Sequence, residues 1–302
     1  MRRIGILLFA AVPVAIAAVV YFLVPSDPAE SPADSTVATA RQAAREEAKS
    51  RAEQERAADD KLIESLPPGL AGRAKKELAQ QLVSSAESST LDWRHTYGSI
   101  EDLDDGQGYT AGIIGFCTGT HDLLALVENY TEAHPDNGLA RYLPALREVD
   151  GTDSHEGLDP GFTAAWKAEA EVAAFREAQD AERDRAYFNP AVRLAKLDGL
   201  GTLGQFVYYD AMVFHGAAVD GDGFYVLRER ALNKADSPSA GGSEKAYLKA
   251  FLDVRRTAMR EKNPNTDTTR LDTAQRRFLD EGNLGLSTPL EWRVYGETYR
   301  VP

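Results

Sequence analysis

The 302-residue sequence has little sulfur, with three methionines and one cysteine, Cys117. A single cysteine cannot form a disulfide within the chain. Cys117 ends the apolar run 112–117, which predicts a small buried side chain. A nucleophilic thiol would need a nearby base and a lowered pKa, and the sequence around Cys117 does not indicate either.

Histidine is also scarce, and its spacing does not suit a metal. The motifs H-E-x-x-H and G-x-S-x-G are absent, so the sequence predicts no metal site, no serine nucleophile and no cofactor. A glycine-rich stretch at 106–111 fits the G-x-G-x-x-A pattern of a dinucleotide loop. Three aspartates just before it would repel a pyrophosphate, and no helix start follows. The five histidines are His95, His121, His134, His155 and His215.

Positive charge is the next shortage. Lys and Arg number 34 against 47 for Asp and Glu, which gives a net charge of -13. Such a field repels nucleic acid and attracts a cationic partner, although many proteins are acidic for solubility alone. The charge therefore argues against a nucleic-acid partner and modestly favours a cationic ligand.

The N-terminus carries the one long apolar run. Arg2 and Arg3 precede an uncharged segment, Ile4 to Val24, that ends at Pro25. Basic residues before such a segment direct export, and its length is enough to span a bilayer. Residues 1–25 are predicted to be a signal peptide or an uncleaved signal-anchor. The rest of the chain is then secreted or tethered to the outer face of the membrane, with no other membrane contact.

Composition divides the chain beyond Pro25 into a stalk and a catalytic domain. Residues 26–39 are rich in Pro, Ser, Asp and Ala, which is typical of a linker. Residues 40–65 are dominated by Ala, Arg, Glu, Gln and Lys, which favours a solvated helix or a disordered stalk. The sequence Leu-Pro-Pro-Gly then interrupts this pattern. We therefore expect a linker and charged stalk over 26–66 and one domain over 67–302.

The domain is predicted to be mainly helical. Apolar residues four apart predict a helix over 74–86, and an Asp-Gly turn with nearby glycines predicts one small β hairpin near 103–115, with Ile113 and Ile114 as a strand. Further helices are expected over 162–185, 190–216, 245–259 and 273–279.

Two carboxyl groups suit glycosidic bond cleavage. Glu87 lies at the predicted end of the first helix, and Asp105 lies 18 residues later in the hairpin turn. One carboxyl group of such a pair donates a proton to the leaving oxygen and the other activates water. Thr110 is placed to hold that water. Spacing alone also fits an ordinary helix-end glutamate and a plain turn aspartate.

Longer motifs surround this pair, and they resemble the chitosanases of glycoside hydrolase family 46, in the lysozyme-like superfamily. The likeness extends from about residue 75 to 299. The matching runs are LVSSAESSTLDW at 82–93, IEDLDDGQGYTAGIIGFC at 100–117, DAERDRAYF at 180–188, LGQFVYYD at 203–210 and YLKAFLDVR at 247–255. The resemblance implies a monomeric, two-lobed, mainly helical α+β enzyme with a cleft between its lobes. It also implies inverting endo-hydrolysis of β-1,4 bonds between glucosamine units in chitosan.

The resemblance also implies individual roles. Its catalytic positions fall on Glu87, Asp105 and Thr110. Its substrate-binding positions fall on Ser89, Gln107, Asp122, Tyr187 and His215. A buried ion network expected to link the lobes falls on Asp210, Arg255 and Arg270.

Two positions leave alternatives open. Asp122 equally suits a helix cap. Gln107 stands where the family usually has arginine, which preserves hydrogen bonding and loses a charge. Two other functions therefore remain: a peptidoglycan-cutting muramidase of similar architecture, and a membrane-tethered glycan-binding protein whose catalysis is weakened or lost.

Overall fold

The computed structural model of the protein describes residues 32–302. The predicted signal segment, 1–25, lies outside the described residues. The chain divides into two units between Ala57 and Ala58, and each unit is described by itself.

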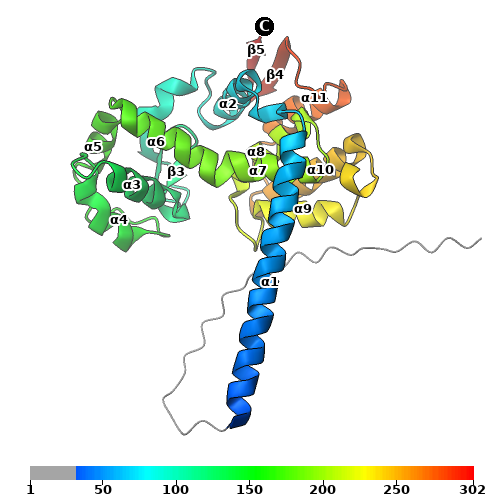
Figure 1. The fold of residues 1–302 in the computed structure, drawn as a ribbon. Coiled ribbons are helices and arrows are strands. Elements are labelled where there is room, and N and C mark those ends of the chain that lie inside the picture. Colours follow the sequence, from blue (N-terminus) through cyan, green and yellow to red (C-terminus); the bar gives the residue numbers. More distant parts are fainter. Residues whose placement is uncertain (1–31) are drawn as a thin grey trace, which may run out of the picture. The chain divides into compact units, whose positions relative to one another are not determined.

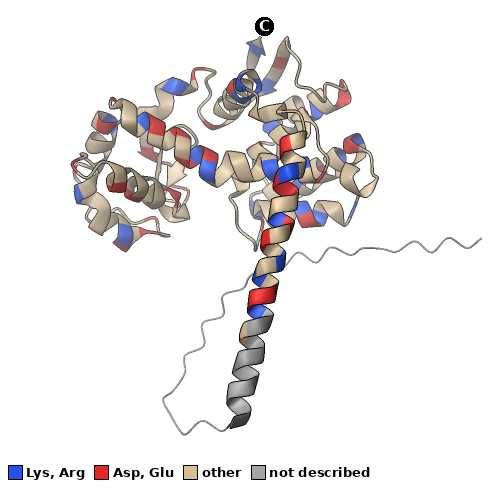
Figure 2. Ribbon diagram, in the orientation of Figure 1, with Lys and Arg blue, Asp and Glu red and all other residues tan. Residues whose placement is uncertain are grey.

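The first described element is a single long helix, α1 (Pro32–Ser65; Figure 1). Its described side chains are almost all exposed, and charges of both signs alternate along its described part (Figure 2). Lys49 and Glu53 pair one turn apart at 4.0 Å. A solvated helix is therefore the correct alternative for the stalk. It begins at Pro32 instead of the expected Ala40, because proline is tolerated in the first turn of a helix.

The second unit is mostly helical with two small antiparallel sheets. Its α-helices are α2 (Arg73–Glu87), α3 (Asp122–Ala133), α4 (Leu143–Val149), α5 (Phe162–Glu169), α6 (Ala173–Arg183), α7 (Asn189–Leu197), α8 (Thr202–His215), α9 (Phe224–Leu232), α10 (Glu244–Lys262) and α11 (Arg276–Asp280). Its strands are β1 (Ile100–Asp102), β2 (Tyr109–Ala111), β3 (Phe116–Cys117), β4 (Leu290–Val294) and β5 (Glu297–Val301). Two π-helical turns are η5 (Asp184–Phe188) and η7 (Arg270–Gln275). Short 3-10 turns are η1 (Gly69–Ala71), η2 (Trp93–Gly98), η3 (Thr118–Thr120), η4 (Ala140–Tyr142) and η6 (Pro238–Ala240).

Buried apolar side chains form two separate cores. The larger core joins the inner faces of α2, α7–α11 and β4, around the fully buried Trp292 and Tyr208. The smaller core joins η2, β1–β3 and α3–α6, around Trp166 and Phe162. In Figure 1 the elements of each core gather on opposite sides, with α6 running through η5 into α7 between them. Among the partly buried side chains, Tyr187 and Val213 pack against both cores.

This arrangement confirms the mainly helical, two-lobed α+β architecture. Trp93 and Trp166, which belong to the smaller core, are 5% and 0% exposed. The three-stranded sheet is ordered β1-β2-β3, and its first two strands pair Ile100 with Ala111 and Asp102 with Tyr109.

Several expected elements were wrong in detail. The helix over 162–185 is broken between Ala170 and Val172, and the helix over 190–216 is broken between Asp198 and Gly201. Ile113 and Ile114 lie in the tight turn between β2 and β3, buried without strand pairing. The C-terminal hairpin of β4 and β5 was missed. Tertiary packing sets these breaks, and apolar spacing alone does not reveal them.

Within residues 32–302, no helix combines the length and the apolar character needed to cross a membrane.

Candidate active site

Glu87 is the last residue of α2. Leu78, Leu82 and Val83 bury one face of this helix in the larger core, which fixes where the helix ends. The Glu87 side chain is 26% exposed, and its Oε1 lies 2.7 Å from Nη2 of Arg270. Beyond it the backbone turns sharply, with the exposed Ser89 in the left-handed region at φ 52°. Glu87 is therefore a half-buried carboxyl group with one oxygen held by a cation.

Arg270 is itself held by a buried network. Its Nη2 donates to Asp210 Oδ1 at 2.8 Å, and Arg255 Nη2 donates to Asp210 Oδ2 at 2.9 Å. Gln275 Nε2 adds a third hydrogen bond to Asp210 at 2.6 Å. Burial alone would raise the pKa of Asp210, but the two guanidinium groups outweigh it and lower that pKa to about 2.

The three predicted network residues thus come together, but not between the lobes. Asp210, Arg255 and Arg270 lie on α8, α10 and η7, which all pack in the larger core. The expectation that they join the two lobes was wrong, because no element of the smaller core supplies a charge to the network among the described ion pairs. The sequence also did not reveal that Arg270 reaches Glu87, 183 residues away along the chain, and no local pattern marks that contact.

Asp105 has different surroundings. It lies exposed in the loop between β1 and β2, between Asp104 at φ 54° and Gly106 at φ 83°. Its Oδ1 accepts the backbone N–H of Gln107 at 3.0 Å, and its Oδ2 accepts the Gln107 side-chain amide at 3.0 Å. Gln107 therefore retains hydrogen bonding to Asp105 without supplying a charge, as its residue type predicted.

Close backbone contacts fix the far side of this loop. The Gln107 carbonyl accepts the N–H of Gly119 at 2.9 Å. A Cβ on Gly108 would lie 2.3 Å from Thr118 Oγ1, and one on Gly119 would lie 2.9 Å from the Gln107 carbonyl oxygen. Glycine is required at both positions, and at Gly108 also by its φ of 67°.

Thr110 lies on β2, where its hydroxyl is 3.3 Å from the Cys117 sulfur. Burial raises the pKa of the Cys117 thiol to about 11, so the sulfur stays protonated. The interpretation of Cys117 as an inert buried residue fits these values. The water-holding role of Thr110 stays a prediction.

Asp122 begins α3 and is only 9% exposed. Its Oδ1 accepts the N–H groups of Cys117 and Leu123, both at 2.9 Å, and the Thr120 hydroxyl at 2.7 Å. Its Oδ2 accepts the Tyr187 hydroxyl at 2.5 Å. Burial raises the pKa of Asp122. Two predicted substrate contacts, Asp122 and Tyr187, therefore bind each other, and Oδ2 is the oxygen that a ligand would share with Tyr187.

His215 ends α8 beside the network. Its ring packs on Phe214 with centroids 4.8 Å apart, and its Nε2 is buried without a hydrogen-bond partner in the described part of the chain. Burial and the neighbouring Arg255 and Arg270 lower the pKa of His215 to about 2, so the imidazole is neutral. The substrate contact of His215 stays a prediction.

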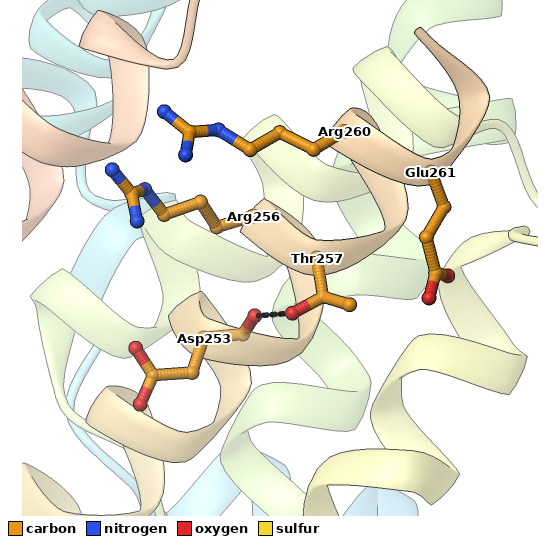
Figure 3. A pocket seen from close by; sticks show the side chains of 5 residues that line it. All are labelled: Asp253, Arg256, Thr257, Arg260 and Glu261. Carbon is orange, nitrogen blue, oxygen red and sulfur yellow. Dashed lines mark hydrogen bonds between the residues drawn. The ribbon is translucent and has the colours of Figure 1, made fainter. Parts of the chain in front are cut away.

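A cavity lies away from these residues. A shallow cavity of about 460 Å³ is lined by charged residues of α10, with Arg256 and Arg260 extending side by side (Figure 3). Its four charged residues sum to zero net charge, and none is a predicted site residue. The lining residues are Asp253, Arg256, Thr257, Arg260 and Glu261.

Residues 32–302 contain no cluster of three or more His, Cys, Asp or Glu side chains arranged to hold a metal ion. The chemistry available from these residues is that of two carboxyl groups in unlike settings. Glu87 belongs to the larger core and is held by a cation, and Asp105 belongs to the smaller core and is held by a neutral amide.

Comparisons with known proteins identify the family of the chain. The sequence is 54% identical over 233 residues to a chitosanase of Streptomyces sp. (strain N174), covering 77% of this chain and 84% of that one. It is 52% identical over 233 residues to a chitosanase of Nocardioides sp. (strain N106), again covering 77% and 84%. The solved structure of chitosanase OU01 with substrate is 52% identical, with a TM-score of 0.76 over 77% of this chain and 98% of that one. The sequence model of glycosyl hydrolase family 46 matches residues 81–290, and the chain belongs to this family.

Proposed function

We propose that this chain hydrolyses the β-1,4 bonds between glucosamine units inside chitosan, with inversion at the anomeric carbon. The observation that carries the proposal is the pair of unlike carboxyl groups, one from each core, in a member of family 46. The named relatives are chitosanases, which favours this function over a muramidase. The enzyme is a glycoside hydrolase.

Glu87 is proposed as the general acid. Arg270 forms an ion pair with Oε1, so Oε2 is the oxygen proposed to carry the proton of the acid form. That oxygen is left to protonate the glycosidic oxygen as the bond breaks. Asp210 holds Arg270 and Arg255 holds Asp210, so the buried network fixes the cation beside Glu87.

Asp105 is proposed as the general base. Each of its oxygens accepts one hydrogen bond from Gln107, which leaves further lone pairs facing solvent. One of them takes a proton from a water that attacks the anomeric carbon on the face opposite the leaving group, which gives inversion. Thr110 is proposed to orient that water.

The proposed ligand is a polycation, and the protein carries a net charge of -13. This charge raises the local concentration of glucosamine ammonium groups at the surface. Asp122, through Oδ2, with Ser89, Gln107, Tyr187 and His215, is proposed to line the sugar-binding cleft between the lobes. We propose that the chain acts as a monomer.

We also propose the three-part organisation of 1–25, 26–66 and 67–302, with the enzyme exported. The family match begins at residue 81, so the stalk helix α1 lies before the matched region. N-terminal sequencing of protein recovered from outside the cell would test this arrangement. A start near residue 26 supports a cleaved signal, an intact N-terminus supports an anchor, and retention in the cytoplasm contradicts both.

Glu87→Gln and Asp105→Asn test the chemistry. Each should lower kcat on chitosan by about 10²- to 10⁴-fold, since each removes one proton transfer. Circular dichroism and thermal unfolding should match the parent. The control is Glu281→Gln, a change to an exposed carboxylate that pairs with Arg277, and it should leave kcat unchanged.

The product distinguishes the remaining alternatives. Proton NMR of the first product should show the α-anomer, and a β-anomer would contradict inversion. Cleavage of acetylated cell-wall glycan without cleavage of chitosan would indicate a muramidase. Chitosan binding with no release of reducing sugar would indicate a binding protein.

A further inference from the structure

We propose that His155 is a positioning residue for the catalytic base: it clamps both ends of the loop that carries Asp105. The proposal rests on the role of Asp105 proposed above. His155 lies outside the predicted site and does not touch Asp105 in any described hydrogen bond or ion pair, so its effect passes through the loop.

Three contacts hold the His155 ring. Its Nε2 lies 3.1 Å from Asp102 Oδ2, and its Nδ1 lies 3.6 Å from Asp159 Oδ2. The ring stacks on Tyr109 with centroids 3.9 Å apart and planes 6° from parallel. The Tyr109 hydroxyl donates to Asp159 Oδ1 at 2.8 Å. Imidazole, phenol and two carboxylates thus form one closed cluster.

The cluster lies at the base of the catalytic loop. Asp102 is the last residue of β1 and Tyr109 is the first residue of β2, and the two are partners in the sheet. His155 contacts both, so it closes the two ends of the 103–108 loop against each other. Asp102 continues the chain of contacts, because its Oδ1 accepts the N–H of Asp104 at 2.8 Å. Any shift of Asp102 therefore reaches the residue next to Asp105.

The groups around the ring come from three segments. Asp102 on β1 and Asp159 ahead of α5 face its two nitrogens at ion-pair distance, and Tyr109 on β2 lies against its face. Nε2 makes no hydrogen bond within the described residues, so proximity and stacking hold the ring. Burial raises the pKa of Tyr109 to about 12, so its hydroxyl remains a donor to Asp159.

Burial supports a role beyond surface charge pairing. The side chains of His155 and Asp102 are 26% and 28% exposed, whereas His95 and Asp92 form a similar pair that is 82% and 59% exposed. An exposed pair contributes little to stability. His95 also belongs to the smaller core's surface, on η2, so it offers a matched control.

The decisive variant is His155→Phe, which retains an aromatic ring to stack on Tyr109 and removes both nitrogens. We expect kcat on chitosan to fall about tenfold, because small displacements of a catalytic group are costly. KM should stay within about twofold of the parent, since no substrate contact is removed. His95→Phe should leave both kcat and KM unchanged.

A second variant tests the same contact independently, in case His155→Phe does not fold. Asp102→Asn retains an oxygen for the Asp104 N–H and removes the charge that faces His155. It should show the same fall in kcat at constant KM.

Two results would overturn the proposal: an unchanged kcat in a folded variant, or a raised KM at constant kcat. Failure of the chitosanase assignment is separate, because it would appear as an inactive parent enzyme.

Discussion

The two carboxyl groups of the site are held by opposite means. Glu87 stands on the larger core, where Arg270 holds it and a fully buried ion network holds Arg270. Asp105 stands on the smaller core, in an exposed loop, where a neutral amide holds it and the loop is closed by a half-buried cluster around His155. In the proposed roles, a general acid must aim its proton at the leaving oxygen and a general base must reach water, which suits a fixed Glu87 and a solvent-facing Asp105.

This contrast indicates where each side is vulnerable. Removing one residue of a buried ion pair lowers the stability of the protein strongly, because the remaining charge is left buried without a partner or water. An exposed carboxylate loses little stability when a neighbour changes, since water replaces the contact. We therefore expect changes near Glu87 to lower the stability of the protein and changes near Asp105 to alter its activity and pH profile.

On the larger-core side, Asp210→Ala should have the largest effect of the changes considered, and the effect should be on stability. It leaves Arg255 and Arg270 buried without their shared carboxylate, and the free energy of unfolding should fall by about 3–5 kcal/mol. Urea unfolding at neutral pH measures the change. Arg277→Ala removes an exposed pair with Glu281 and should cost less than about 0.5 kcal/mol. Equal losses in the two variants would show that burial does not govern the network.

Lowering the pH should reduce the difference in free energy of unfolding between the parent and Asp210→Ala. The pKa of Asp210 is about 2 in the folded protein against an ordinary value of 3.8. A lowered folded-state pKa gives stability that is present above about pH 4 and is lost as the pH falls towards about 2. The parent should therefore lose about 2 kcal/mol over this range, a loss that the variant lacks. A gap that stays constant from pH 4 to pH 2 would contradict the lowered pKa.

The sequence predicted the two sides unequally. Helix spacing places Glu87 at a helix end, and the Asp-Gly turn places Asp105 in a hairpin, because both signals are local. The contact of Arg270 with Glu87 and the clamp of Asp102 by His155 join segments far apart along the chain. The breaks at 170–172 and 198–201 depend on packing against other helices in the same way. Local patterns thus predicted the elements that carry the carboxyl groups, but not the side chains that position them.

Gln107→Arg should have the smallest effect of these changes. It tests the comparison by giving both carboxyl groups a neighbouring cation. A guanidinium at 107 would place a cation beside Asp105, as Arg270 places one beside Glu87. A nearby cation favours the ionised carboxylate, so the acidic limb of the kcat profile should move to lower pH by about half a unit to one unit. Gln54→Arg adds the same charge on α1, before the family match, and should leave the profile in place. An unmoved limb in Gln107→Arg would mean that solvent screens position 107, and that the neutral amide serves the base through geometry alone.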